Sequence, residues 1–395
     1  MTDGELEAVF DRQGRLVLPE AVAGEYGFTP GTRIRIRPSP SGLLLRPPVS
    51  RLAKVYLEPT NACNLECRTC IRHSWNEPIG RMTDETFARV VRGLRPFSPP
   101  PGVFFGGMGE PLAHPGIVDM VRQAKSLGSR VELITNGTLL DNRVAEQLID
   151  AGLDLLWVSL DGATPEGYAD VRLGAALPGI LSNLRAFRRI RWRKHRPVGV
   201  DLTLQPQLGI VLVAMKRNLS DLPAVFGLAS RLGALHFMVT NVVPYTKEMQ
   251  KEILYTRALD DTIYASSPLL RVLDLPKMDV NPTTREAIYE AMRGNHSLSI
   301  SGGGLGERNN RCPFEHKGSL SIRWDGNVSP CLPLLHDHVS YLHGYRRSFR
   351  HHAVGAGGQV GEPLLGLLEP LVDPAVVVLR LAPENPSPQT HRCFS

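Results

Sequence analysis

Three cysteines lie within eight residues in the segment CNLECRTC, as Cys63, Cys67 and Cys70. This C-x3-C-x2-C spacing directly follows an apolar run that is typical of a strand, so the three thiols should share one tight loop. Thiolate is the natural protein ligand of iron–sulfur clusters. Three thiolates would leave one iron of a four-iron cluster without a protein ligand, free to chelate an amino and a carboxylate group. We therefore predict a [4Fe–4S] cluster on this loop.

A zinc knuckle or a set of buried free thiols is the alternative for these cysteines. Structural zinc normally takes four protein ligands. The loop holds no fourth cysteine or histidine, although His73 lies three residues beyond it. Further segments at predicted strand ends agree with a cluster and its ligand. They are GGMGEP at 106–111, ITNGT at 134–138 and VSLDG at 158–162.

Strands and helices alternate through residues 51–245. The predicted strands are KVYLEP, VFFGG, RVELIT, LLWVSLD, VGVDLTL and ALHFMVTN, and helical periodicity covers about 83–95, 115–127, 142–152, 176–192 and 220–232. Such alternation predicts an α/β fold with a parallel sheet and right-handed crossovers. Six units are too few for an eight-fold barrel, so we expect an open or partial (βα)6 barrel. Ligands of such folds bind at the carboxyl ends of the strands, where these motifs fall.

In this order and at these strand ends, the motifs resemble the radical S-adenosylmethionine (SAM) superfamily. The resemblance implies SAM as a second cofactor beside the cluster of Cys63, Cys67 and Cys70. GGMGEP resembles the family's glycine-rich SAM-binding motif, because glycine lets a backbone approach a ligand closely. Thr69 departs from the family, which usually has an aromatic residue before the third cysteine. The residues implied in SAM binding are Gly106, Gly107, Glu110, Asn136, Ser159, Asp161 and Arg172.

The resemblance also implies roles for these side chains and a reaction. Glu110 would receive the cationic amino group of SAM, Ser159 and Asp161 would hydrogen-bond a ribose or carboxylate, and Arg172 would lie near the SAM carboxylate. The reduced cluster would cleave SAM to methionine and a 5′-deoxyadenosyl radical, which abstracts a hydrogen from a substrate. A reductant such as ferredoxin or flavodoxin would supply the electron. The protein would orient and shield this chemistry, so no catalytic side chain is assigned and the substrate stays open.

Residues 246–395 are less regular and hold two more cysteines at a suggestive spacing. Cys312 is followed by thirteen residues and then by Gly326 and Cys331 in a G-x4-C pattern. This resembles the start of a SPASM domain, which carries auxiliary iron–sulfur clusters and implies Cys312 and Cys331 as ligands of an auxiliary [4Fe–4S] cluster. The full pattern needs later cysteines, and only Cys393 follows. Periodicity weakens beyond about Gly355, so we hypothesise that a truncation or frameshift removed the other ligands.

Other features of this region are structural predictions. SLSIRWDGNVSPC predicts a hairpin with its turn at Asp325-Gly326. The spacings of histidines fit no metal site, so we expect loop histidines at these positions. They are His336, His338, His343, His351 and His352.

Residues 1–48 predict a separate, β-rich module, joined to the rest by RPPVS at 46–50. The module resembles an AbrB-type swapped-hairpin domain through DRQGRLVLPEAV, GFTPGTRIRIR and GLLLRP. Such modules pair into homodimers and often bind DNA. Phosphate contacts would fall to arginines, but acidic residues offset them, so we favour dimerisation or partner docking over DNA binding. The arginines are Arg12, Arg15, Arg33, Arg35 and Arg37.

Composition is that of an ordinary soluble protein. Among 395 residues, 45 Lys and Arg oppose 39 Asp and Glu, a net charge of only +6. The sequence has neither the ~18-residue apolar run of a membrane span nor a secretory signal. We therefore expect a cytoplasmic protein without a membrane partner, in which clustered cysteines bind metal and do not form disulfides.

Within the family, the chain resembles the tungsten-cofactor oxidoreductase maturases over roughly residues 51–350. The likeness rests on CRTCIRHSW, VAMKRNLSDLP, TNVVPYTKEM and CPFEHKGSLSIRWDGNVSPCLPLLH. It implies that the substrate is a tungsten-dependent oxidoreductase or its cofactor. Two alternatives stay open: a SPASM enzyme that modifies a peptide or protein, and a DNA-binding regulator with a sensory cluster. SAM cleavage separates the regulator from the enzymes, because a sensor need not bind SAM.

Overall fold

The structure is a computed structural model. It describes residues 8–13, 15–20, 35–39, 42–46, 52–194, 204–255, 264–266, 272–275, 278–293, 297–300, 318–341, 347–349 and 377–379. Among these residues, no helix is long and apolar enough to cross a membrane.

A nine-stranded sheet forms the core, in the order β11-β10-β9-β8-β7-β6-β5-β14-β15. The central strands from β5 to β10 pair in parallel, as the alternation of strands and helices predicts. The sheet is open and not closed into a barrel, because β11 and β15 lie at its two edges. The six central strands are β5 (Lys54–Leu57), β6 (Gly102–Phe105), β7 (Val131–Thr135), β8 (Leu155–Ser159), β9 (Gln207–Ala214) and β10 (His236–Asn241).

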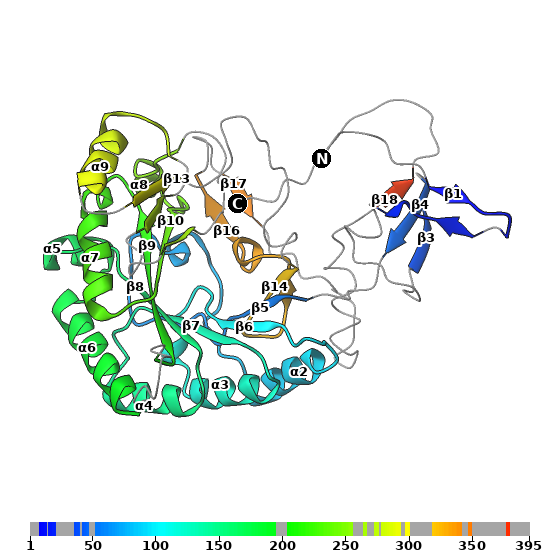
Figure 1. The fold of residues 1–395 in the computed structure, drawn as a ribbon, viewed down its shortest axis with the longest axis horizontal. Coiled ribbons are helices and arrows are strands. Elements are labelled where there is room, and N and C mark those ends of the chain that lie inside the picture. Colours follow the sequence, from blue (N-terminus) through cyan, green and yellow to red (C-terminus); the bar gives the residue numbers. More distant parts are fainter. Residues whose placement is uncertain are drawn as a thin grey trace.

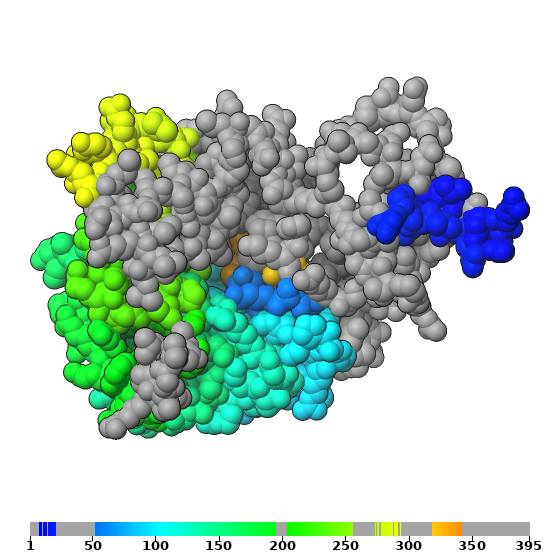
Figure 2. All heavy atoms as spheres, viewed as in Figure 1, coloured from blue at the N-terminus to red at the C-terminus, as the bar shows by residue number. Residues whose placement is uncertain are grey.

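Helices cover one face of this sheet (Figure 1). In the space-filling view, the same helices make up the cyan-to-green surface at the lower left (Figure 2). Five of them lie close to the predicted ranges: α2 (Asp84–Leu94), α3 (Ile117–Ser126), α4 (Asn142–Asp150), α6 (Leu177–Lys194) and α7 (Leu222–Leu232). Three more helices were not predicted: α5 (Pro165–Val171), α8 (Lys247–Gln250) and α9 (Pro282–Arg293).

Local sequence explains where these helices begin and end. Side chains of Thr83, Asp141 and Thr164 cap α2, α4 and α5, each accepting a hydrogen bond from a backbone N–H of the first turn. Helix α7 ends at Gly233, whose φ of 76° is readily adopted by glycine. These fixed helix ends in turn fix the loops that carry the motifs.

The fifth strand differs from its prediction. The sequence VGVDLTL was predicted as that strand, but Leu204 lies outside any strand and residues 198–203 lie outside the described residues. The strand that pairs with β8 is β9, with Leu208, Ile210 and Leu212 fully buried. Both stretches are rich in branched apolar residues, so composition alone could not choose between them.

Strands from beyond residue 245 complete the sheet. β11 (Tyr264–Ser266) pairs antiparallel with β10, and β14 (Ser319–Ile322) pairs in parallel with β5. β14 and β15 (Val328–Ser329) form the predicted hairpin. The C-terminal region therefore contributes directly to the sheet that carries the cysteine loop.

The remaining strands form two- and three-stranded sheets. At the N-terminus, β1 (Val9–Phe10) pairs antiparallel with β2 (Leu16–Val17). β3 (Arg35–Ser39) pairs with β4 (Gly42–Arg46), which also pairs with β18 (Val377–Leu379) from the C-terminal tail. The other two sheets pair β12 (Val272–Leu275) with β13 (Ser297–Ile300) and β16 (His338–Ser340) with β17 (Arg347–Phe349).

Neighbouring residues of β7 provide a test of the two-faced sheet. Leu133 is fully buried in the core, whereas Ile134 is half-buried and lines the cavity on the opposite face. We expect Leu133→Ala to lower the free energy of unfolding by about 2–5 kcal/mol, because it leaves a void in a close-packed layer. Ile134→Ala should cost clearly less. Urea denaturation of both variants measures the difference, and equal losses would contradict this assignment of faces.

Candidate cofactor site

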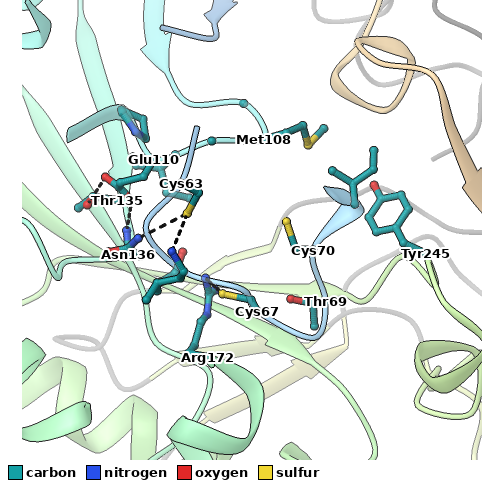
Figure 3. A pocket seen from close by; sticks show the side chains of 17 residues that line it. Cys63, Cys67, Thr69, Cys70, Met108, Glu110, Thr135, Asn136, Arg172 and Tyr245 are labelled. Atoms are coloured by element: carbon teal, nitrogen blue, oxygen red, sulfur yellow. Dashed lines mark hydrogen bonds between the residues drawn. The ribbon is translucent and has the colours of Figure 1, made fainter. Parts of the chain in front are cut away.

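The three cysteines line one cavity at the carboxyl ends of the central strands. The loop that carries them runs from β5 to the short 3-10 helix η1 (Ile71–Ser74). The cavity has a volume of about 210 Å³. Cys63, Cys67 and Cys70 all contribute to its wall (Figure 3). Of the other predicted SAM-binding residues, Gly107, Glu110, Asn136, Ser159 and Arg172 also line it, whereas Gly106 and Asp161 do not.

The chemistry around the thiols fits an iron–sulfur cluster. The Asn136 side-chain amide lies 3.9 Å from Cys63 Sγ, and Arg172 Nη1 lies 3.7 Å from Cys67 Sγ. Such N–H donors favour the negative sulfur of a metal-bound thiolate. Burial raises the pKa of the Cys63 thiol and raises that of Cys70 to about 11. Metal binding must therefore displace protons from these thiols.

The described residues include no group of three His, Cys, Asp or Glu side chains close enough to hold a single metal ion. A cubane distributes its cysteine ligands over different iron atoms, so its ligands need not converge on one point. This finding therefore does not bear on the cluster.

Glu110 is buried with only 2% of its surface exposed. Its Oε1 accepts hydrogen bonds from Thr135 Oγ1 at 2.7 Å and from Leu112 N at 3.0 Å, and its Oε2 accepts from Asn136 N at 2.8 Å. Burial raises the pKa of the carboxyl, while the hydrogen bonds from Asn136 and Thr135 oppose that shift. A carboxylate offers about four acceptor sites, so Glu110 retains capacity for one cationic ligand group on the cavity side.

Asp161 is bound by groups of the protein itself. It is fully buried, its Oδ2 accepts from Arg172 Nε at 2.6 Å, and its Oδ1 accepts from Val213 N at 2.8 Å. Burial lowers the pKa of the Arg172 guanidinium, but Asp161, Cys67 and Tyr168 together outweigh burial and the net pKa is raised. Asp161 therefore holds Arg172, whose Nη1 lies near Cys67 Sγ, while its predicted contact with SAM stays a prediction.

The glycines of GGMGEP make room for the protein itself as much as for a ligand. A Cβ at Gly109 would lie 2.2 Å from the carbonyl oxygen of Thr60, and one at Gly106 would lie 2.5 Å from the Phe104 ring. Gly107 has a φ of +104° and lies against the Glu58 side chain. Gly107 and Gly109 therefore let the motif pack closely against the start of the cysteine loop. The sequence pattern did not reveal this need for small residues.

Several functional candidates escaped the sequence analysis. Met108, Thr69 and Tyr245 line the cavity, and Tyr245 lies beyond Cys70, on the other side from Glu110 and Asn136 (Figure 3). Tyr245 belongs to TNVVPYTKEM, a stretch singled out by resemblance without a mechanism. The resemblance of that stretch was the one feature of the sequence that could have drawn attention to Tyr245, but nothing in it indicated that the side chain lines the cavity.

An ion-pair network braces the outside of the cysteine loop. Arg68, between Cys67 and Cys70, donates to the Asp170 carbonyl at 2.6 Å and lies 3.3 Å from Glu248. Arg217 contacts Asp170 and Glu248 at 2.8 Å. VAMKRNLSDLP and TNVVPYTKEM therefore supply residues that hold the loop in place.

The predicted auxiliary site is only partly described. Cys331 is buried, whereas Cys312 and Cys393 lie outside the described residues. One of the predicted loop histidines needs correction. His336 lies in a loop, as predicted, whereas His338 lies in strand β16. Both side chains are buried, with exposures of 0% and 5%. His343, His351 and His352 lie outside the described residues.

Comparison with known proteins defines the class. Residues 57–206 match the family model described as the Radical SAM superfamily. With the enzyme names of its relatives, this match makes the protein a radical SAM enzyme whose cofactors are a [4Fe–4S] cluster and SAM. The prediction of this class and of both cofactors is confirmed. The individual SAM-binding assignments stay predictions.

Among its relatives, one from Pyrococcus furiosus is named tungsten-containing aldehyde ferredoxin oxidoreductase cofactor-modifying protein. It is 29% identical over 301 residues, which is 76% of this chain and 77% of that protein. An AdoMet-dependent heme synthase from Methanosarcina barkeri is 31% identical over 47% of this chain and 50% of its own length. The chain thus spans only half the length of this second relative.

A solved structure has a similar fold. Streptococcus suis SuiB, bound to the precursor peptide SuiA, aligns with a TM-score of 0.53 at 15% identity. The alignment covers 83% of this chain and 66% of SuiB. At this identity the likeness concerns the fold alone.

Two aspartates with similar partners test the importance of burial at the site. Asp161→Ala removes the partner of a buried arginine, and we expect it to lower the free energy of unfolding by about 3–5 kcal/mol. Asp154 also pairs with a cation, Lys125 at 2.7 Å, and a backbone N–H, that of Val131 at 2.6 Å, but its side chain is 28% exposed. Asp154→Ala should cost only about 1 kcal/mol.

Chemical denaturation of the cluster-free protein measures both losses. If the two variants lost equal stability, the buried pair of Asp161 and Arg172 would not have the structural role assigned to it.

Proposed function

We propose that this enzyme matures a tungsten-dependent oxidoreductase by modifying its cofactor. The observation that carries the proposal is the likeness to the Pyrococcus furiosus cofactor-modifying protein over 301 residues. That alignment is about twice as long as the 57–206 match to the radical SAM family. The shared sequence therefore reaches beyond the parts that all radical SAM enzymes need.

Residues outside the family match support this proposal. Tyr245 lines the cavity, and Arg217 and Glu248 brace the cysteine loop. All three lie in stretches that resemble the tungsten-cofactor maturases. A substrate that enters the cavity beside Tyr245 would contact a residue from a stretch that resembles the tungsten-cofactor maturases.

The chain's own residues would hold the cofactors as follows. When bound, the cluster and SAM supply the reductive cleavage of SAM and the abstraction of hydrogen from the substrate. Cys63, Cys67 and Cys70 would ligate the cluster, and Glu110 would accept the amino group of SAM with its remaining lone-pair site. Arg172, held by Asp161, would place a fixed positive charge beside the cluster and the SAM carboxylate.

The first test is anaerobic cleavage of SAM. We reconstitute the protein with iron and sulfide, reduce it with dithionite, add SAM, and measure 5′-deoxyadenosine by chromatography. Wild type should form it, and Cys67→Ala should lose at least about 99% of the product, because a cluster ligand is missing. Cys393→Ala, in the tail, should retain it. A fully loaded, reducible wild type that formed no 5′-deoxyadenosine would contradict the proposed site.

The second test concerns the substrate. We add tungsten oxidoreductase isolated from cells lacking this enzyme, or the cofactor extracted from it, and expect formation of 5′-deoxyadenosine to rise several-fold. Mass spectrometry of the extracted cofactor should show a mass change that requires both SAM and Cys67. An unchanged cofactor, with stimulation only by a co-purifying short peptide, would transfer the proposal to the peptide-modifying alternative.

In this proposal the two terminal regions support the radical SAM core. The SPASM-like start, with Cys312 and Cys331, would hold an auxiliary cluster if the missing ligands come from another chain segment. The AbrB-like residues 1–48 would serve dimerisation or docking in preference to DNA binding. Ferredoxin or flavodoxin would deliver the electron in the cytoplasm.

A further inference from the structure

We propose that His336 is a positioning residue for SAM, acting through Glu58 on the glycine-rich loop. The inference rests on the proposed SAM-binding role of that loop. It assigns a function to a histidine from the C-terminal region that does not itself line the cavity. The chain of contacts runs from His336 to Glu58 and from Glu58 to the backbone of Met108.

Glu58 is the middle of this chain. It follows β5 directly and is fully buried. Its Oε1 accepts a hydrogen bond from Met108 N at 2.9 Å. Its side chain also lies where a Cβ of Gly107 would be, with Glu58 Cγ only 2.6 Å from that point. Because Gly107 and Met108 line the cavity, the position of the Glu58 carboxylate sets the shape of the wall that would face SAM.

His336 holds this carboxylate from the other side. It is fully buried, and its Nε2 lies 2.8 Å and 3.0 Å from the two oxygens of Glu58. A carboxylate that already accepts from Met108 N needs a donor here, so the contact fixes the proton on Nε2. The Trp75 ring packs edge-on against the imidazole, with centroids 4.5 Å apart. Glu58 thus bridges a buried, ring-packed histidine and the glycine-rich loop.

A second carboxylate, Glu77, ties the same segment to the chain just beyond η1. Glu77 accepts from Asp337 N at 2.9 Å and lies 3.9 Å from His336 Nδ1. Arg323, at the end of β14, lies 3.3 Å from Glu77. His336 and its neighbour therefore contact residues that flank both SAM-facing loops, although only Glu58 reaches the backbone of the cavity wall.

A purely structural role for His336 predicts something different. Such a histidine would stabilise the docking of the C-terminal segment and leave SAM affinity unchanged in any variant that folds. Glu77 provides the matched control, because it contacts the same segment and the same imidazole but makes no bond to the glycine-rich loop. A positioning role predicts that SAM affinity depends on the contact between His336 and Glu58 and not on the contacts of Glu77.

The experiment measures binding and not turnover. We load each variant with its cluster, keep the cluster oxidised so that SAM is not cleaved, and determine the Kd of radiolabelled SAM by equilibrium dialysis. His336→Leu, which loses the donor to Glu58, should bind SAM about tenfold more weakly. His336→Gln, whose amide can still donate, should stay within about threefold of wild type, as should Glu77→Gln. Iron content and thermal midpoint are recorded for each variant.

A second readout follows the hydrogen bond itself. Amide hydrogen exchange of the peptide covering residues 106–110 should accelerate about tenfold in His336→Leu and remain near the wild-type rate in Glu77→Gln. Should His336→Leu fail to fold, Glu58→Gln replaces it, because a neutral amide oxygen is a weaker acceptor for Met108 N. We expect that variant to bind SAM about fivefold more weakly.

The outcomes separate this inference from the proposed function. Wild type that binds no SAM would overturn the proposed site. Wild type that binds SAM, with unchanged Kd and unchanged exchange at 106–110 in folded His336→Leu or Glu58→Gln, would overturn the role of His336 alone. Equal weakening in His336→Leu and Glu77→Gln would also overturn it, because loss of the docked segment would then explain both.

Discussion

The site depends on the burial of negative charge at the ends of the parallel strands. Glu58, Glu110 and Asp161 follow β5, β6 and β8 and are 0%, 2% and 0% exposed. A buried carboxylate is costly unless hydrogen bonds or a cation compensate for lost water. Each of the three accepts at least one of its hydrogen bonds from the end of the next strand: Glu58 from Met108, Glu110 from Thr135 and Asn136, and Asp161 from Val213. The requirement to satisfy these charges therefore joins successive strand ends around one cavity.

The sequence was informative wherever chemistry and local structure coincide. The cysteine spacing and the strand-end motifs were readable because each is a short segment whose residues act together. Helices α2, α3 and α4 were predicted well because their apolar periodicity is a local signal, and capping side chains mark the starts of α2 and α4. The pairing of β14 with β5 was not readable, because nothing in Ser319–Ile322 indicates which distant strand edge it will meet.

Side-chain direction was the other property that sequence could not supply. Ser159 is the last residue of β8 and Asp161 lies two residues further on. Both were given the same role, yet Ser159 lines the cavity and Asp161 faces Arg172 and Val213. His336 lies in a loop as expected, but its burial was not foreseen, because the partner that explains it, Glu58, is distant in the chain. Long-range partners of buried polar groups are a property of the packed fold, and no local pattern encodes them.

The cavity also explains why the reaction class is easier to infer than the substrate. Cys63, Glu110, Asn136 and Arg172, on the cofactor side, all fall within residues 57–206, the part matched by the family model. Tyr245 lies beyond that match and contributes a wall past Cys70. Cofactor chemistry imposes the same donors on every member of a class, whereas a substrate wall must fit one molecule. Specificity therefore has to be sought in Tyr245 and in the C-terminal segment that His336 ties to the glycine-rich loop.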